Sequence, residues 1–331
     1  MDNFTHSLVG WALGQTGLKT KSRKGLAALV LGANLPDIDV FFGWVPWLPL
    51  ATHRGFTHGL LGGVILMPPM LAGLLWLLDR WQVRRGATFD SGLAMHVPWL
   101  FALCYIGAIT HPLLDLQTSY AIQLLSPFST RWFHTETLFI IDVWIWTGLA
   151  FAIWLSRRRE KKDSDWRRPA RVALIMLCLY LGLNGAISLM ARKTLHDSIP
   201  DLRADVLIAG EQPVLFWKRD LVWRRDGMIG QASYDPLKGL FSAQDRLVVL
   251  PTMTPDNMGD PLARRAMTAN PQVVTFMRWS IMPLAQVRHE QCRAIVTFGD
   301  ARFGVPTGRS RLTQSVTLPL DRPGCGPASA N

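Results

Sequence analysis

The segment 59–78, GLLGGVILMPPMLAGLLWLL, most strongly constrains how this chain folds. It holds twenty apolar residues and no charged side chain, which is typical of a helix that crosses a lipid bilayer. Its Pro68-Pro69 pair predicts a kink in that helix. Because other apolar segments precede and follow it, the sequence predicts an α-helical polytopic membrane domain. We expect about six helices, at residues 4–18, 25–45, 59–78, 93–110, 137–155 and 171–190.

The charge of the chain agrees with a membrane location. The formal net charge is +11, and in other proteins such a positive charge often indicates nucleic-acid binding. Here the basic residues cluster at the ends of apolar runs, and several of the 14 tryptophans flank those runs, as in an interfacial aromatic belt. We therefore attribute the positive charge to membrane orientation and expect membrane lipid, but no nucleic acid, as a partner. The first residues lack the basic region and cleavage site of a signal peptide.

Basic residues also predict which side of the membrane each connection faces. The clusters lie at 19–24, 80–85 and 157–168, and alternation through six spans puts all three on one side, the cytoplasmic side. The connections 46–58 and 111–136 then face the opposite side, together with the C-terminal region. The cluster 157–168 is a topology determinant in this interpretation, although it is also suited to anionic lipid.

The last 140 or so residues differ from the rest. Apolar runs shorten to strand length and are separated by Gly, Pro and Asp-Gly signals, while Asp260-Pro261 predicts the start of a short helix. We therefore divide the chain into a helical membrane domain, 1–192, and a small β-rich soluble domain, 193–331. Cys292 and Cys325 in this domain either form a disulfide or are two unrelated thiols. The expected strands are 206–209, 214–217, 221–223, 247–250, 273–279, 294–298 and 316–318.

Histidine and aspartate residues accompany the apolar segments in a pattern that favours metal binding. The hexapeptide 53–58, HRGFTH, contains two histidines, and we expect His53 in a loop and His58 on the next helical turn. His111 and Asp115 are four residues apart, so both lie on one helix face. Asp37 and Asp39 follow Pro36, which disfavours helix at Leu35 and lets irregular backbone direct both carboxylates inward.

All of these residues lie on the side opposite the basic clusters, as does His6. Such ionisable groups need a partner near a membrane, and mixed imidazole and carboxylate ligands suit zinc, with manganese or iron as alternatives. A single His–Asp pair is more often a structural ion pair, so the inference depends on the whole set. The predicted metal ligands are His6, Asp37, Asp39, His53, His58, His111 and Asp115, with weaker candidates His134, Glu136 and Asp142.

The motifs resemble those of the DUF457, or YdjM/YbcI-like, family of bacterial inner-membrane, metal-dependent hydrolases. The resemblance covers about residues 1–155 and rests on the opening MDNFTHS and on PDID, HRGFTH, HPLLD, LSPF and FIID. The family is itself similar to zinc-dependent phospholipase C and P1 nuclease, which implies metal-ligand roles for His6, His111, Asp115 and one member of each other pair. The chain departs from the family at Gly59, where serine is expected, and at 134–136.

These observations predict a membrane-bound metal-dependent hydrolase. We expect a phosphoesterase that acts on a lipid-linked or envelope substrate from the periplasmic side of the inner membrane. Asp39 or Asp37 would bridge metals or take a proton, and Thr57 would orient a ligand. Arg54 would pair with a phosphate oxygen of the substrate, or it is a contact to a lipid headgroup. Two alternatives remain: a metal-stabilised scaffold whose β-rich domain binds a partner, and a metal transporter, which needs ligands along the spans to both faces.

Overall fold

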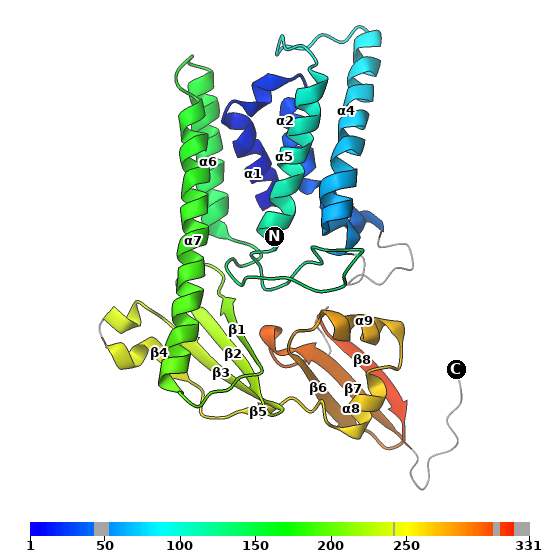
Figure 1. The fold of residues 1–331 in the computed structure, drawn as a ribbon, viewed down its shortest axis with the longest axis vertical. Helices are drawn as coiled ribbons and strands as arrows, with labels where there is room; N and C mark the ends of the chain where they lie inside the picture. The colour runs from blue at the N-terminus through cyan, green and yellow to red at the C-terminus, as the bar shows by residue number, and fades with distance from the viewer. Residues whose placement is uncertain (43–52, 241, 307–311, 321–331) are drawn as a thin grey trace. The chain divides into compact units, whose positions relative to one another are not determined.

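A computed structural model describes the chain except for residues 43–52, 241, 307–311 and 321–331 (Figure 1). The chain forms two compact units. The first, Met1–Ile187 with Glu211–Phe216, is mainly helical, and the second comprises Ser188–Gly210 and Trp217–Asn331. The predicted order of a helical domain followed by a β-rich domain is confirmed. The division falls inside the last long helix, a few residues before the predicted boundary.

Among the residues that the structure describes, three helices are long and apolar enough to cross a membrane: Leu60–Arg84, Val97–Asp115 and Arg167–Ser198. The predicted spans 4–18 and 25–45 form helices of only 13 and 10 residues, which reach about 20 and 15 Å. Part of the 25–45 segment lies outside the described residues. The helices are α1 (Asn3–Gln15), α2 (Gly25–Asn34), α4 (Met67–Arg84), α5 (Val97–Asp115), α6 (Val143–Glu160) and α7 (Arg167–Ser198).

Prolines shape two of these segments. After α2 the backbone tightens into a 3-10 helix, Leu35–Phe42, because Pro36 removes a hydrogen-bond donor from the ladder. Leu35 itself keeps helical angles (φ −60°, ψ −38°), so the predicted break is a change of helix type. Pro68 and Pro69 lie where the helical segment Leu60–Arg84 changes type. They occupy the first turn of its α-helical part, α4, directly after a π-helical stretch, Leu60–Leu66.

Glycines let α2 and α5 approach closely. A Cβ atom at Gly107 of α5 would lie 2.5 Å from the carbonyl oxygen of Leu29, and one at Gly32 of α2 would lie 2.8 Å from that of Cys104. Both distances are shorter than van der Waals contact, so only glycine permits this spacing. The close approach brings the last turn of α2 against the C-terminal turns of α5.

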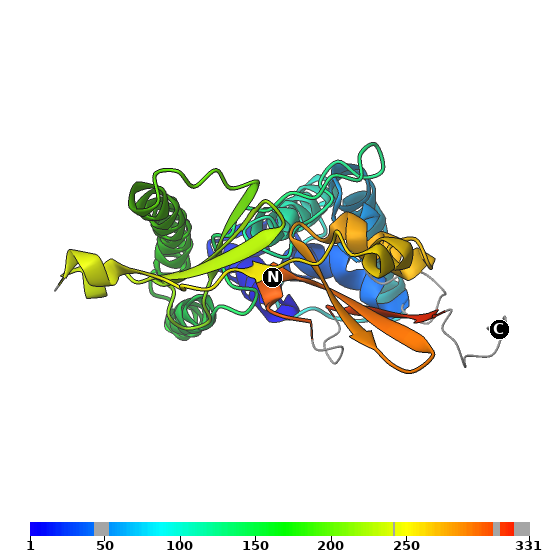
Figure 2. The ribbon, with the colours of Figure 1, turned by 90° about the horizontal axis from the view of Figure 1, so that it is seen from below.

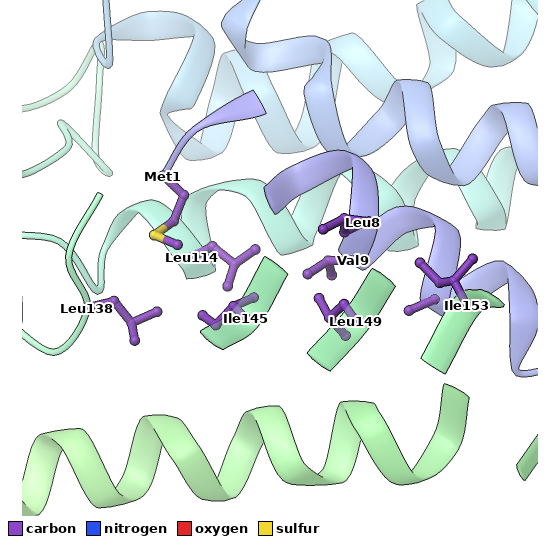
Figure 3. Close-up of a cluster of buried hydrophobic side chains, with 9 residues drawn as sticks. Met1, Leu8, Val9, Leu114, Leu138, Ile145, Leu149 and Ile153 are labelled. Atoms are coloured by element: carbon purple, nitrogen blue, oxygen red, sulfur yellow. The ribbon is translucent and has the colours of Figure 1, made fainter. Parts of the chain in front are cut away.

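A buried apolar cluster joins α1 to α6. Leu8 and Val9 of α1 pack against Ile145, Leu149 and Ile153 of α6 (Figure 3). The three α6 residues are four apart in sequence, so they form one face of that helix. This packing fixes the orientation of the first turns of α1. Figures 1 and 2 show α6 and α7 together at one side of the helical unit, with α4 at the other.

The basic clusters gather at one end of the helical unit. Arg23 forms a two-pronged ion pair with Asp79 of α4 at 2.7 Å, and Lys19 pairs with Glu160 at the end of α6 at 2.6 Å. The opposite end holds the start of α1 and of α6 and the end of α5. The helices therefore separate the basic clusters 19–24, 80–85 and 157–168 from the predicted metal ligands.

The second unit contains two antiparallel sheets. One has the order β1-β2-β3-β4, with β5 also paired to β3, and the other has the order β6-β7-β8. A buried cluster that includes Ile208 and Val222 from the first sheet and Leu284 from the second joins them. The strands are β1 Val206–Glu211, β2 Arg219–Arg225, β3 Met228–Tyr234, β4 Leu247–Val249, β5 Thr254–Pro255, β6 Pro283–His289, β7 Arg293–Asp300 and β8 Gln314–Pro319.

Two predicted strands are wrong. The segment 273–279 belongs to helix α9, Pro271–Trp279, whose first turn is capped by the side chain of Asn270. Val273, Phe276 and Trp279 are its buried residues, and a spacing of three fits a helix face rather than the alternation of a strand. The segment 214–217 lies between β1 and β2 and is not a strand.

The helix start predicted at Asp260-Pro261 is confirmed. Asp260 caps helix α8, Pro261–Ala266, through its side chain. Cys292 is disulfide-bonded, whereas Cys104 and Cys178 are free. The proposed partner of Cys292, Cys325, lies outside the described residues.

Asp300 at the end of β7 is buried beside Arg302. Burial alone would raise the pKa of this carboxyl, but the neighbouring guanidinium and the hydrogen bonds to the carboxylate have a larger effect. The pKa of Asp300 therefore lies below its usual range.

Candidate metal centre

The structure brings all seven predicted ligands together at one end of the helical unit. They come from four segments: the start of α1, the 3-10 helix after α2, the hexapeptide 53–58 and the end of α5. Their ligand atoms form three overlapping groups, in each of which all atoms lie within 4.8 Å of one another. The groups are His6 with His111 and Asp115, Asp37 with His58 and His111, and Asp37 with Asp39 and His53.

The inner part of the cluster centres on Asp115 and is fully buried. Its Oδ1 lies 3.5 Å from Nε2 of His6, and its Oδ2 lies 3.4 Å from Nε2 of both His58 and His111. His6 and His111 stack with ring centroids 3.8 Å apart. His111 donates through Nδ1 to the carbonyl oxygen of Ala33 at 2.7 Å. A carbonyl oxygen only accepts, so that hydrogen bond places a proton on Nδ1 and turns Nε2 toward the cluster.

The outer part of the cluster centres on Asp37 and Asp39. Asp37 lies 3.1 Å from Nε2 of His58. Asp39 lies 3.0 Å from Nδ1 of His53 and accepts a hydrogen bond from the Thr57 hydroxyl at 2.7 Å. The same hydroxyl is 3.0 Å from Nδ1 of His58. Thr57 therefore contacts both a carboxylate and an imidazole of the cluster.

Local backbone geometry explains why these side chains meet. In the 3-10 helix the side chains of Asp37 and Asp39 are about 120° apart around the helix axis, closer than the about 160° of a regular α-helix, and both are buried. In the hexapeptide, Arg54 adopts the left-handed conformation with φ 62°. The turn is therefore not made by the glycine of the hexapeptide, because Gly55 has φ −91° and ψ −117°.

Gly59, the residue that departs from the family pattern, has a steric reason to be glycine here. A Cβ atom there would lie 2.8 Å from the carbonyl oxygen of Ser126. The connection between α5 and α6 thus packs directly on the hexapeptide, and Leu60 donates its amide hydrogen to the carbonyl oxygen of Leu124 at 2.9 Å. This contact holds the hexapeptide against the cluster.

Several buried atoms of the cluster lack hydrogen-bond partners among the described residues. They are both ring nitrogens of His6, Nε2 of His111 and Oδ2 of Asp115. Buried polar atoms without partners are costly and uncommon. The Nε2 atoms of His58 and His111 stand 3.1–3.5 Å from carboxylate oxygens of Asp37 and Asp115. Atoms bound tetrahedrally to one zinc ion at about 2.0–2.1 Å stand about 3.3 Å apart. The residues therefore fit a divalent cation.

Two nitrogen-bearing groups adjoin the carboxylate of Asp115. The α-amino group of Met1 contacts Oδ1, and Nη2 of Arg54 lies 3.5 Å from the same atom. Arg54 is buried, donates to the Thr118 hydroxyl at 3.1 Å and lies over the ring of Tyr120 at 4.6 Å. These contacts fix the guanidinium beside the cluster.

The weaker candidates do not join the three groups. His134 and Glu136 pair with each other at 2.9 Å. Asp142 caps α6 by accepting from the amides of Trp144 and Ile145, and it also accepts from the Tyr180 hydroxyl at 2.9 Å. A carboxylate at a helix start is a standard cap, so the helix boundary accounts for Asp142.

The sequence reasoning missed the groups that support the ligands. Thr118 and Tyr120 hold Arg54, and the carbonyl oxygen of Ala33 fixes the orientation of His111. Thr118 lies three residues after Asp115 and donates to its carbonyl oxygen at 2.9 Å, so a search for hydroxyl residues just past the motif would have found it. A backbone carbonyl leaves no mark in the sequence.

Comparison with known proteins agrees with the motif analysis. The profile of the YdjM inner membrane protein family matches residues 1–191, more than half of the chain. The chain belongs to this family. The matched part contains every candidate ligand. The uncharacterized protein YfhP of Bacillus subtilis (strain 168) is similar, with 23% identity over 235 residues, which is 66% of this chain and 64% of YfhP. No solved structure matches the chain significantly.

Proposed function

We propose that this YdjM-family membrane protein is a metal-dependent hydrolase, and that it cleaves a phosphoester bond in a lipid-linked or envelope substrate. The observation that carries the proposal is the buried cluster of imidazoles and carboxylates whose unpartnered atoms point at one another. Such a set is suited to one or two zinc, manganese or iron ions. The resemblance of the motifs to metal-dependent hydrolases supports the same chemistry.

The residues divide into holding and reacting groups. His6, His58, His111, Asp37 and Asp115 would hold the cation, which when bound supplies Lewis acidity and lowers the pKa of water toward about 7. Asp39 would accept a proton, because Thr57 orients its carboxylate at the outer edge of the cluster. Arg54 would stabilise negative charge on a phosphate oxygen from its fixed position.

Burial indicates the side from which a substrate would approach. His6, His58, His111 and Asp115 are fully buried, whereas the side chain of His53 is 31% exposed. The edge formed by His53 is therefore the open edge of the cluster. Because Asp39 lies next to His53, a reacting phosphate would meet the proposed proton acceptor first.

Metal analysis and hydrolysis of a chromogenic phosphodiester by the purified protein test the proposal. We expect bound zinc, manganese or iron in the wild type and loss of both metal and hydrolysis in His58→Ala and Asp115→Asn. His196→Ala is the matched control, because His196 is exposed on α7. Full wild-type hydrolysis in both cluster variants would refute the proposal.

A metal-stabilised scaffold is a second candidate, favoured by the complete burial of the inner ligands. In that case the ion would be fully coordinated, with no open position for water. The same experiment separates the two candidates. Bound metal without hydrolysis of any phosphoester, together with loss of folding on chelation, supports the scaffold.

We also propose that the protein crosses the membrane several times, with the cluster and the β-rich unit on the periplasmic side. The support is the separation of the ligands from the basic residues at opposite ends of the helices, together with the positive-inside rule. Reporter fusions after residues 125, 162 and 210 test this orientation. A cytoplasmic signal from the fusion after residue 210 would contradict it.

A further inference from the structure

A cavity of about 710 Å³ lies between α6 and α7, away from the histidine and aspartate cluster. Its volume is within the range of ligand sites in proteins, about 300–1,000 Å³. The α6 wall is one face of the helix: Trp144, Gly148, Phe151, Ala152, Leu155 and Arg159. A Cβ atom at Gly148 would meet nothing within 4 Å, so the space beside this wall is open.

The α7 wall is also apolar along most of its length. Val172, Met176 and Tyr180 recur every four residues and therefore share a face. Val172 and Met176 are about half exposed, at 49% and 57%, so the neighbouring helix does not cover them. At one end the Tyr180 hydroxyl donates to Asp142 and closes the cavity.

The other end of the cavity is cationic. Arg159 and Arg168 line it, one from each helix. Among the described residues neither arginine forms an ion pair, whereas the adjacent Glu160 is paired with Lys19. Eight basic and three acidic residues occupy positions 157–171, so this end of the cavity has a strong excess of positive charge.

Both walls of the groove are at least as long as one leaflet of a bilayer. The α7 wall runs along about 18 Å of helix from Arg168 to Tyr180, and the α6 wall runs along about 22 Å from Trp144 to Arg159, whereas half of a hydrocarbon core is about 15 Å. A groove with an apolar wall of this depth and two unpaired guanidinium groups at its end fits a lipid with an acyl chain and a phosphate. Arginine is well suited to hold phosphate through two parallel hydrogen bonds.

We propose that the α6–α7 groove binds one anionic glycerophospholipid. Its phosphate contacts Arg159 and Arg168, and an acyl chain lies along Phe151, Val172 and Met176. This assignment does not depend on the proposed hydrolase activity, because the groove shares no residue with the candidate ligands. It gives the arginine-rich segment a specific ligand in addition to its effect on topology.

Native mass spectrometry of the full-length protein, released from nanodiscs of mixed phosphatidylglycerol and phosphatidylcholine, tests the proposal. We expect one phosphatidylglycerol per chain in the wild type. The double variant Arg159→Gln/Arg168→Gln should retain it about 10- to 30-fold less, because it loses the direct charge-assisted hydrogen bonds of both guanidinium groups to the phosphate. Lys161→Gln/Lys162→Gln removes the same charge from the same segment outside the groove, where salt screens the remaining attraction, and should leave retention within about twofold.

A second pair of variants tests the apolar part of the groove. Gly148→Leu should fill the groove and reduce retention of phosphatidylglycerol and of phosphatidylcholine. Gly182→Leu should not, because Gly182 is at an equally open position outside the groove. The masses also report whether the groove is an interface between two copies. Equal loss in both double variants, displacement of the lipid by inorganic phosphate alone, or a dimer that Gly148→Leu disrupts would each overturn the proposal.

Discussion

Replacement of Gly107 by alanine tests whether the close contact of α2 with α5 sets both stability and the ligand cluster. The new Cβ atom would lie 2.5 Å from the carbonyl oxygen of Leu29 and 3.1 Å from the amide nitrogen of Ala33. Both obstacles are backbone atoms, so α2 must move as a unit. Overpacking of this kind costs about 3 kcal/mol at the upper end of its usual range.

The intrinsic preference of alanine for helix offsets part of that cost. Gly→Ala inside a helix gains about 1 kcal/mol, so the expected net loss in the free energy of unfolding is about 2 kcal/mol. Gly73→Ala in α4 is the matched control, because a Cβ atom there would meet nothing within 4 Å. It should gain up to about 1 kcal/mol.

The same displacement should weaken metal binding. α2 carries the Ala33 carbonyl oxygen that orients His111, and it leads directly into the segment that carries Asp37. A shift of α2 therefore moves one ligand and releases the orientation of another. Titration with denaturing detergent, followed by tryptophan fluorescence, measures stability, and elemental analysis measures bound metal. If Gly107→Ala proves as stable as Gly73→Ala, the packing argument is wrong.

Three further predictions concern other contacts. Thr57→Val should reduce metal affinity or activity about 10- to 100-fold, because it removes the hydroxyl that supports Asp39. Thr57→Ser keeps the hydroxyl and should retain both. Equal metal affinity and activity in the two variants would contradict this role. The pKa of Asp300 is lowered in the folded protein. The ionised carboxylate therefore contributes fully to the free energy of unfolding above the ordinary aspartate pKa, near 4, and this contribution is lost as the pH falls through the lowered pKa of the folded protein. Asp300→Asn should therefore destabilise the protein by about 3–5 kcal/mol at pH 7, and this difference in unfolding free energy should shrink below about pH 4; a constant difference would refute the linkage. Finally, a thiol reagent applied to unreduced, unfolded protein should label Cys104 and Cys178 only, since Cys292 is disulfide-bonded; label on Cys292 would exclude the disulfide.

The sequence by itself determined the features that depend on local pattern. The length and composition of the apolar segments specify helices for a membrane, since backbone polar groups in lipid must be satisfied within the segment. The four-residue spacing of His111 and Asp115 places both on one face of α5 whatever packs around them. The same local logic explains why Asp260 caps a helix. Prediction from local pattern was wrong at 273–279. An apolar run of this length is compatible with a strand or a helix, and the segment forms a helix whose first turn is capped by Asn270.

Only the tertiary structure decided how the candidate site is assembled. The ligands come from four segments that meet because glycines let α2 contact α5 and because the connection after α5 packs on the hexapeptide. The support of His111 by the Ala33 carbonyl and the left-handed backbone of Arg54 are products of that packing. The groove between α6 and α7 is likewise invisible in either helix alone, because a cavity is a property of two faces and of the distance between them. Residue types and their spacing identify the side chains that can bind a metal or react. The orientation of those side chains is set by backbone contacts between segments that are distant in the sequence.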